Sequence, residues 1–371
     1  MKQSVKFKWF RIQSVAILFI LFSLSLNAQK AAVKLRWVDV KELCVEGKGW
    51  TDTKQFYDRL PAKAQGVVRP SIWELQHDAA GIVIRFVTNG TSIAARWTLT
   101  KSKLSIPNVS ASGVSGLDLY VRENGKWGWF GAARPDEITN EKMLTTGLSP
   151  KDRECMLYLP LRNGIEKLEI GIPEDASCSL PPERPKGMKP IVFYGTSIVQ
   201  GAAASRPGMT YPALICRHLD RTMINLGFAG NAVCEPEMAS LLAELDPALY
   251  IIDPLPNMSA QMVKERTGKL IETIRVAHPK TPIIMVENTE MGDANTNPAR
   301  RNGYAAANLE LRKIYEQRIK EGDRKLYYIH GDKLLGTDGE GTVDRVHPTD
   351  LGFMRMIKII KPVVKRALKR N

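Results

Sequence analysis

Between residues 33 and 180 the apolar side chains recur at about every second position, which is the period of a β-strand that buries one face. Ser92–Leu99 and Leu117–Arg122 alternate in this way, and a further run resumes at Trp127 after the pair Asn124-Gly125. An Asn-Gly pair between two alternating runs is a strong hairpin signal. Because short strands follow one another with few helical periods between them, the sequence predicts an all-β sandwich for this half of the chain.

After residue 190 the pattern changes to short apolar runs separated by segments with a helical period. The predicted strands are 191–194, 223–226, 249–253, 282–287 and 326–329, and the predicted helices are 211–219, 236–244, 262–278, 304–321 and 351–368. Strands that alternate with helices imply right-handed crossovers and a parallel sheet in an α/β fold. Ligands of such sheets bind beyond the carboxyl ends of the strands, so the residues that follow each strand are the candidates for a site.

A proline-rich segment separates the two patterns. Residues 181–190 contain four prolines, so they cannot hold a regular helix or a central strand. We therefore expect a β-sandwich domain over residues 29–185 and a second domain over residues 186–371. The roughly 340 residues that follow residue 28 also exceed what one hydrophobic core usually holds, which favours two domains.

The first 28 residues have the composition of a secretory signal peptide. Four basic side chains and no acid accompany an apolar run at Val15–Leu26, and the run ends in a small-residue pattern at Asn27-Ala28. A membrane anchor is the alternative, but the run is shorter than the roughly 20 apolar residues that a span needs. No later stretch is long and apolar enough to cross a membrane. We therefore expect a secreted or periplasmic protein from which residues 1–28 have been removed.

The chain carries a formal net charge of +14, and removal of residues 1–28 takes away four bases and no acid, which leaves +10. Such an excess could favour polyanionic partners. The bases are densest between Lys358 and Arg370, where the solvated face of a terminal helix is the simpler interpretation. No zinc-finger spacing and no RNA-binding aromatic motif is present, so no nucleic-acid partner is expected.

Five cysteines are present, namely Cys44, Cys155, Cys178, Cys216 and Cys234. An odd number leaves at least one thiol unpaired or paired between chains, and Cys155 with Cys178 is a possible pair. No Cys-x-x-Cys occurs, so neither a zinc site nor a redox site is indicated. No metal and no cofactor is expected, and the oligomeric state is left open by the sequence.

Two strand ends of the second half carry candidates for nucleophilic catalysis. The first strand ends in Gly195-Thr-Ser197, where a sharp turn exposes a serine hydroxyl near backbone N–H groups. A helix N-cap serine is the alternative interpretation of so short a motif. After the last strand, Asp344 stands three residues before His347, close enough to bond the ring Nδ1 and leave Nε2 for the serine. His330, which ends a strand, is the one rival base.

Two further strand ends carry groups that suit the binding of an oxyanion. Gly227 and Gly230 follow the second strand, and a glycine there offers an unobstructed N–H. A phosphate-binding loop is disfavoured, because the G-x-G-x-x-G spacing and the Walker lysine are absent. Asn257 follows the third strand, where its side-chain amide either donates a hydrogen bond to an oxyanion or closes a turn.

Together these blocks resemble the SGNH (GDSL-type) hydrolases, whose chains carry Ser, Gly, Asn and His in this order. Ser197, Gly230, Asn257 and His347 match the four blocks, and Gly230 fits the second block better than Gly227 because a polar residue follows it directly. The resemblance implies a flavodoxin-like, three-layer α/β/α hydrolase domain.

A second motif extends the resemblance to nearly the whole chain after residue 28. Gly116-Leu-Asp-Leu-Tyr120 is similar to the Gly-x-Asp-Leu-Tyr motif of a jelly-roll-like β-sandwich that precedes the hydrolase domain in one subgroup. Two positions depart from the commoner blocks. Thr196 stands where Gly-Asp-Ser has an aspartate, and Pro256-Asn257 replaces Gly-x-Asn-Asp. These departures make the transfer of a substrate from the wider family unsafe, but they remove no catalytic group.

The resemblance implies a serine esterase in which His347 takes the proton of Ser197 and Asp344 stabilises the imidazolium. It also implies an oxyanion hole made of the backbone N–H groups of Ser197 and Gly230 with the Asn257 amide. Exported enzymes of this build resemble carbohydrate esterases. The expected partner is therefore an acylated small molecule or polysaccharide, most specifically an O-acetylated glycan.

Two other functions are weighed against this one. A lipase or thioesterase is the first, although no long apolar lid segment is visible in the sequence. A catalytically silent glycan-binding protein is the second, with the sandwich as the binding part. Trp127, Trp129 and Phe130 are either a stacking platform for sugar or part of a core, and the core is the favoured interpretation.

Overall fold

The computed structural model describes residues 33–290, 292–293 and 296–369, and the expected signal peptide lies outside these ranges. Residues 1–36 and 37–371 form separate units, and the second unit contains everything described below apart from the start of β1. Among the described residues no helix combines the length and the apolar character of a membrane span.

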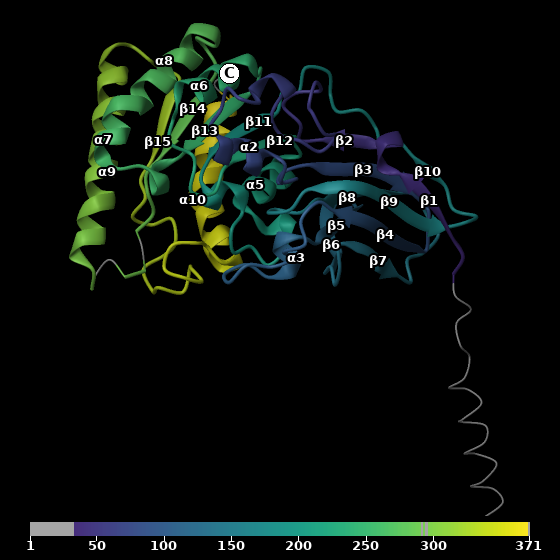
Figure 1. Ribbon diagram of the computed structural model, residues 1–371. Coiled ribbons are helices and arrows are strands. Elements are labelled where there is room, and N and C mark those ends of the chain that lie inside the picture. The colour runs from purple at the N-terminus through teal and green to yellow at the C-terminus, as the bar shows by residue number, and fades with distance from the viewer. Residues whose placement is uncertain (1–32, 291, 294–295, 370–371) are drawn as a thin grey trace, which may run out of the picture. The chain divides into compact units, whose positions relative to one another are not determined.

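The first half of the chain is an antiparallel β-sandwich, as the alternating pattern predicted (Figure 1). One sheet has the strand order β1-β9-β4-β7, and the other has the order β10-β3-β8-β5-β6 with β2 beside β3. The elements are β1 (Leu35–Asp39), η1 (Val40–Glu42), β2 (Cys44–Glu46), η2 (Ala62–Ala64), α2 (Pro70–Gln76), β3 (Val83–Thr88), β4 (Ser92–Leu99), α3 (Ala111–Val114), β5 (Leu117–Glu123), β6 (Lys126–Ala133), β7 (Thr139–Thr146), β8 (Arg153–Tyr158), β9 (Ile165–Pro173) and β10 (Cys178–Ser179). Phe86, Trp97 and Leu119 lie in the apolar core of this half.

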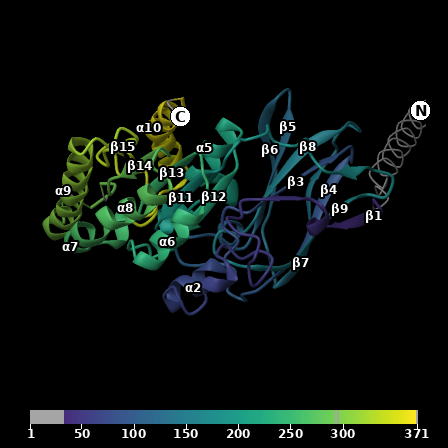
Figure 2. The ribbon, with the colours of Figure 1, turned by 90° about the horizontal axis from the view of Figure 1, so that it is seen from above.

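The second half is a parallel sheet in the order β12-β11-β13-β14-β15 with helices on both faces. Figure 2 shows α6, α8 and α9 along one side of the sheet and α5 and α10 along the other. The elements are β11 (Ile191–Gly195), α4 (Ser197–Gln200), η3 (Pro207–Met209), α5 (Tyr211–Leu219), β12 (Met223–Gly227), α6 (Pro236–Glu244), β13 (Leu249–Asp253), η4 (Leu255–Asn257), α7 (Ala260–Met262), the π-helical turn η5 (Val263–Thr267), α8 (Gly268–Ala277), β14 (Ile283–Val286), α9 (Pro298–Lys320), β15 (Leu326–Ile329) and α10 (Asp350–Lys369). The three-layer α/β/α prediction is confirmed.

β11 to β14 are buried on both faces, and β15 is buried except at the half-buried Tyr328, which explains why the sequence shows continuous apolar runs there. Val192 and Tyr194 of β11 join the core beneath α6 and α8, whereas Ile191 and Phe193 join the core beneath α5 and α10. The predicted helix over 262–278 is interrupted by the π-helical turn η5, which a period of 3.6 residues does not reveal.

The two halves also share a core. Tyr120, Tyr158 and Leu161 of the sandwich half pack in the same buried cluster as Phe193 and Tyr211 of the α/β half. The halves are therefore packed against each other through apolar side chains rather than merely tethered. The predicted domain boundary at residue 185 stays a prediction.

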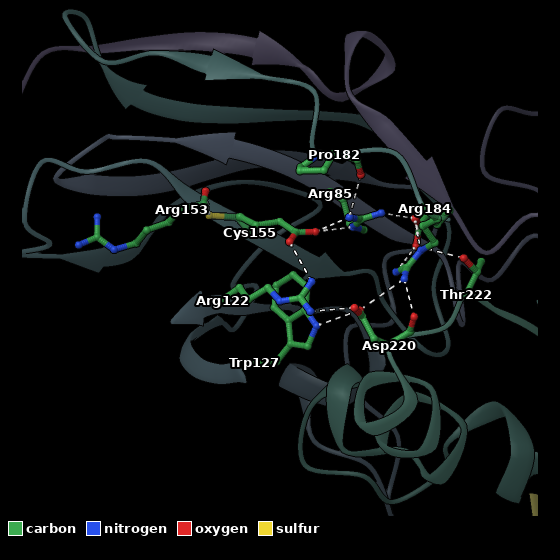
Figure 3. A network of polar contacts seen from close by, with 11 residues as sticks. Arg85, Arg122, Trp127, Arg153, Cys155, Pro182, Arg184, Asp220 and Thr222 are labelled. Carbon is green, nitrogen blue, oxygen red and sulfur yellow. Dashed lines mark hydrogen bonds and ion pairs between the residues drawn. The ribbon is translucent and has the colours of Figure 1, made fainter. Parts of the chain in front are cut away.

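A closed ring of ion pairs adds polar contacts between the two halves (Figure 3). Around the ring, Arg85 pairs with Glu46 and Glu154, Arg122 pairs with Glu154 and Asp220, and Arg184 pairs with Asp220 and Glu46. Arg184 belongs to the proline-rich segment, and its Nε lies 2.7 Å from Oε1 of Glu46. Asp220 caps the carboxyl end of α5. The linker is thus fixed to the sandwich and to the α/β half at once.

Candidate active site

Ser197 is the first residue of α4, directly after β11. Thr196 caps this helix, and its hydroxyl accepts a hydrogen bond from the backbone N–H of Ile198 at 3.2 Å. Gly195 has no room for a side chain, because a Cβ there would lie 2.4 Å from the carbonyl oxygen of Asp253. The turn thus holds Ser197 at the carboxyl edge of the sheet, where only 8% of the residue is exposed.

The hydroxyl of Ser197 and the ring of His347 are in hydrogen-bond contact. Oγ of Ser197 lies 2.9 Å from Nε2 of His347, and Nδ1 of the same ring lies 2.7 Å from Oδ2 of Asp344. When Nδ1–H donates to the carboxylate, Nε2 is left to accept the hydroxyl proton. The structure therefore joins the three residues singled out in the sequence by hydrogen bonds, from Ser197 through His347 to Asp344.

A tight turn before α10 brings Asp344 into contact with Nδ1 of the His347 ring. Oδ1 of Asp344 accepts hydrogen bonds from the backbone N–H groups of Val346 at 3.1 Å and of His347 at 2.8 Å. Arg345 has φ 76°, the left-handed region that costs a non-glycine residue about 1–2 kcal/mol. The N–H of Val343 donates to the carbonyl of His347 and closes the loop at 3.0 Å. The carboxylate is thus held by its own turn.

The carboxyl group of Asp344 is ionised at neutral pH. Its partial burial raises the pKa, but hydrogen bonds from the backbone and ring of His347 and from Asn108 outweigh burial and lower the pKa to about 2. An ionised carboxylate at Nδ1 stabilises the imidazolium that forms when the ring takes a proton.

His330 lies in different surroundings. Its side chain is 62% exposed, and its Nδ1 lies 3.5 Å from Oε1 of Glu287. Its ring packs edge-on against Tyr328 with 5.1 Å between the centroids. Since His347 is the ring bonded to Ser197, the geometry favours His347 over His330 as the base.

The loops that carry Gly230 and Asn257 contact each other. Oδ1 of Asn257 accepts a hydrogen bond from the backbone N–H of Ala232 at 3.4 Å. Gly230 has φ 71° in open space, so its glycine is required by the backbone conformation. Gly227 is required for a different reason, because a Cβ there would lie 2.2 Å from the backbone nitrogen of Gln200 in α4. The oxyanion roles of Ser197 N–H, Gly230 N–H and the Asn257 amide stay predictions.

Comparison with protein families assigns both halves of the chain. Residues 188–365 match the model of the GDSL-like lipase/acylhydrolase family, and residues 35–178 match the model for the N-terminus of SGNH hydrolase-type esterases. A Bacteroides ovatus protein of known structure, described as a GDSL-like lipase, is 38% identical. The alignment covers 91% of this chain and 98% of that chain, with a TM-score of 0.86.

The chain belongs to the GDSL-like lipase/acylhydrolase family. Its broad activity is therefore that of an SGNH-type ester hydrolase. Two more distant structures share the fold. The salicylyl-acyltransferase SsfX3 of a tetracycline biosynthetic pathway is 20% identical over 90% of this chain and 97% of that chain, with a TM-score of 0.73. An acetyl xylan esterase from the rumen bacterium Butyrivibrio proteoclasticus is 13% identical over 90% of this chain and 99% of that chain, with a TM-score of 0.56. The comparison with curated proteins gave no match.

The Gly-x-Asp-Leu-Tyr motif of this acylhydrolase fastens the sandwich to the catalytic half. Asp118 is fully buried and accepts hydrogen bonds from Arg206 Nη1 and the backbone N–H of Gly208, both at 2.8 Å. Burial raises the pKa of Asp118, and these donors work against the rise. The guanidinium of Arg206 also lies over the ring of Tyr120, 5.5 Å from its centroid. The motif thus holds the segment that follows α4.

The three aromatic residues of β6 divide between core and surface. Trp127 and Phe130 are half-buried and pack against separate apolar clusters, in agreement with the interpretation as core. Trp129 is 53% exposed, and its Nε1 donates to Oδ1 of Asp118 at 2.8 Å. Arg206 covers its ring with the guanidinium 4.7 Å from the centroid, so Trp129 belongs to the fastening of the two halves.

The cysteines and the acidic side chains form no further reactive cluster in the described ranges. Cys44, Cys155, Cys216 and Cys234 are free thiols, so the possible pair of Cys155 with Cys178 is not formed. Within the same ranges, no group of three or more histidine, cysteine, aspartate or glutamate side chains is arranged to hold a metal ion.

The sequence did not reveal the contact of Asn108 with the site. Asn108 belongs to the sandwich half, yet its Nδ2 lies 2.8 Å from Oδ2 of Asp344 and 3.1 Å from Nδ1 of His347. No local motif marks this asparagine, and its two partners are 236 and 239 residues away along the chain. Only the docking of the two halves brings these side chains together.

Proposed function

We propose that this acylhydrolase is an exported serine esterase that removes short acyl groups, most specifically O-acetyl groups, from carbohydrate. The observation that carries the proposal is the relay from Ser197 Oγ through the His347 ring to Asp344, with contacts of 2.9 Å and 2.7 Å. A relay of this kind activates a hydroxyl that is otherwise a weak nucleophile at neutral pH.

In the first half of the reaction, Oγ of Ser197 attacks the carbonyl carbon of the ester while Nε2 of His347 takes the hydroxyl proton. The negatively charged Asp344 stabilises the imidazolium that results. The tetrahedral intermediate then expels the sugar oxygen, which takes the proton from Nε2 and leaves as an alcohol. The acyl group remains bound to Oγ.

In the second half, His347 takes a proton from water, and the water oxygen attacks the acyl carbon. Collapse of the second intermediate breaks the bond to Oγ of Ser197 and returns the proton from His347 to it. The products are a free carboxylic acid, an alcohol and the unchanged enzyme, so neither a metal nor a cofactor is required.

The developing oxyanion would be bound by the backbone N–H groups of Ser197 and Gly230 and by Nδ2 of Asn257. The contact between Oδ1 of Asn257 and the N–H of Ala232 supports this assignment, because it orients the amide with Nδ2 available to another acceptor. One such donor typically contributes about 3–4 kcal/mol to transition-state stabilisation.

A groove beside the site supports a substrate larger than a simple acetate ester. It has a volume of about 830 Å³ and is lined by residues 104–111 and 134–136 of the sandwich half and by Val343, next to Asp344. The groove is open, and its lining combines polar side chains such as Arg134 and Asp136 with apolar ones, so it offers both hydrogen bonds and apolar contacts to a sugar. The shared fold with an acetyl xylan esterase and the expected signal peptide point in the same direction.

An acetate-release screen against acetylated polysaccharides tests the proposal, with Ser197→Ala alongside. We expect release by the wild-type protein and near-background release by the variant, whose melting temperature should be unchanged. An organophosphate serine probe should label the wild-type protein at Ser197. Cleavage of long-chain acyl esters without release of acetate from sugars would favour a lipase or thioesterase. Folded protein that the probe does not label would favour a silent glycan-binding protein.

A further inference from the structure

A short hairpin of the sandwich half presents Asn108 at its tip. The backbone N–H of Ile106 donates to the carbonyl of Val109 at 3.1 Å, and the N–H of Val109 donates to the carbonyl of Ile106 at 3.0 Å. These two bonds leave Pro107 and Asn108 as the connecting residues. Proline fixes its own φ, so the tip has little conformational freedom.

The hairpin is fastened to the segment that follows the nucleophile helix. Val109 packs with Val114 and Ala202 in a small buried cluster of its own. The backbone approaches closely at Gly113, where a Cβ would lie 2.5 Å from the carbonyl oxygen of Ala204. Ala202 and Ala204 follow α4, which begins with the nucleophile. The position of Asn108 relative to the site is therefore set by packing rather than by a free loop.

From this position the side chain of Asn108 meets the carboxylate of the relay. Its Nδ2 donates to Oδ2 of Asp344 at 2.8 Å, and the same oxygen accepts Nδ1–H of His347 at 2.7 Å. Both nitrogens are donors to one shared acceptor, which explains why they lie 3.1 Å apart. The reverse orientation of the amide would set its oxygen against a carboxylate oxygen, so the contact with Asp344 fixes the orientation.

The other contacts of Asp344 explain why the hydrogen bond from Asn108 matters. Among the described residues, the hydrogen bonds to its other oxygen come from the backbone of its own turn, which contains Arg345 in a left-handed conformation. The side chain of Asp344 is 35% exposed. The guanidinium of Arg345, in the same turn, pairs with Asp293 at 3.6 Å. The hydrogen bond from Asn108 to Oδ2 of Asp344 thus comes from outside this turn. Asn108 itself is held in place by the packing of its hairpin.

We propose that Asn108 is a positioning residue that fixes the carboxylate of Asp344 against His347, so that the β-sandwich completes the catalytic relay. This inference rests on the proposed esterase function. The sandwich then supports the reaction through Asn108, although none of its side chains needs to contact the reacting atoms. Removal of the hydrogen bond should lower kcat tenfold to hundredfold, roughly what one hydrogen bond to a charged group contributes, and leave KM almost unchanged.

The test compares three replacements with p-nitrophenyl acetate as the substrate. Asn108→Leu keeps the approximate volume, Asn108→Asp keeps the shape but replaces the donor with an acceptor, and Asn108→Ala removes both. All three should lower kcat, because none of them donates a hydrogen bond to a carboxylate at neutral pH. Asn89→Ala is a matched control, since it removes an asparagine that bonds the backbone N–H of Ser177 within the sandwich. The control should keep the wild-type kcat.

A double-mutant cycle separates positioning from a general role in folding. If Asn108 acts through Asp344, then Asn108→Ala should have no further effect on kcat in an Asp344→Ala background. An equal loss in both backgrounds would overturn the proposal, because it would mean that the hairpin serves only to place other groups. Wild-type kcat in Asn108→Leu would overturn it as well. Thermal unfolding of each variant identifies any that fail to fold, and the two shape-keeping replacements then decide.

The outcome also separates this inference from the proposed function. Wild-type protein that hydrolyses no ester, or hydrolysis that survives Ser197→Ala, would refute the esterase assignment itself. Hydrolysis that depends on Ser197 but not on Asn108 would leave the esterase assignment intact and refute the positioning role alone.

Discussion

Arg206 of the α/β half donates a hydrogen bond at 2.8 Å to Asp118 of the sandwich, whose side chain is fully buried. The side chain of Arg206 is 20% exposed, and its guanidinium lies over the rings of Tyr120 and Trp129. A buried carboxylate with several donors gives the two halves a defined register, because any shift would leave charges without partners. The hairpin that carries Asn108 depends on this register.

Asp118→Ala should destabilise the protein strongly. The variant leaves Arg206 without its carboxylate partner and the backbone N–H of Gly208 without this acceptor, and loss of one member of a buried pair costs about 3–5 kcal/mol. Urea unfolding at neutral pH measures the change. Asp246→Ala is the control, since it removes an exposed pair with Lys189 and should cost less than about 1 kcal/mol. Similar losses of unfolding free energy in both variants would show that Asp118 stabilises the protein no more than an exposed ion pair does.

The ring of ion pairs in Figure 3 makes stability depend on pH. Burial raises the pKa of Glu46, but Arg184 and Arg85 outweigh burial and lower it. Partial burial raises the pKa of Asp220, but the hydrogen bonds from Arg122 and Trp127 and the charges of Arg122 and Arg184 outweigh burial and lower the pKa. The folded state therefore binds these protons less readily than the unfolded chain does. Their contribution is complete above the ordinary pKa values of about 4 and is lost as the pH falls through the lowered values.

Glu46→Gln tests this dependence. At neutral pH the variant should lose about 2 kcal/mol of unfolding free energy, because Arg85 and Arg184 lose a shared charged partner. Below pH 4 the difference from wild type should shrink, since Glu46 is then becoming protonated in the wild type as well. Urea unfolding at several pH values measures both effects. Glu237→Gln, on the exposed face of α6, should show no such convergence.

Chain order accounts for where the candidate site residues lie in the fold. Ser197, Gly230, Asn257 and His347 each follow a strand, and parallel strands bring their carboxyl ends to one edge. The Asp344–His347 contact was predictable as well, because three residues suffice for a turn. Asn108 was not, since its place depends on how the sandwich packs against α4 and no periodicity encodes that packing. The π-helical turn at Val263–Thr267 was not predicted either, because it leaves the apolar pattern of a helix almost unchanged.

His347→Ala should abolish most of the activity, whereas His330→Ala should have little effect. Nε2 of His347 lies 2.9 Å from Oγ of Ser197, while His330 is an exposed residue beside Glu287. Loss of the base of a serine relay typically lowers kcat by roughly 10⁴–10⁶-fold. Initial rates with p-nitrophenyl acetate measure both variants under the same conditions. Full activity of the His347 variant together with loss of activity in the His330 variant would show that His330, and not His347, is the base.

Asn257 provides the sharpest test of the oxyanion assignment, because its two amide atoms have separable roles. Asn257→Asp keeps an oxygen that accepts the N–H of Ala232 but removes the Nδ2 donor. We expect kcat to fall by roughly 10²–10³-fold with a small change in KM, since the donor acts only once charge develops on the carbonyl oxygen. Asn257→Ala should lose the same activity and some stability besides, because the loop contact is removed. Steady-state kinetics and thermal unfolding separate the two effects. Activity in Asn257→Asp equal to that of the wild type would limit Asn257 to its structural contact with the loop of Gly230.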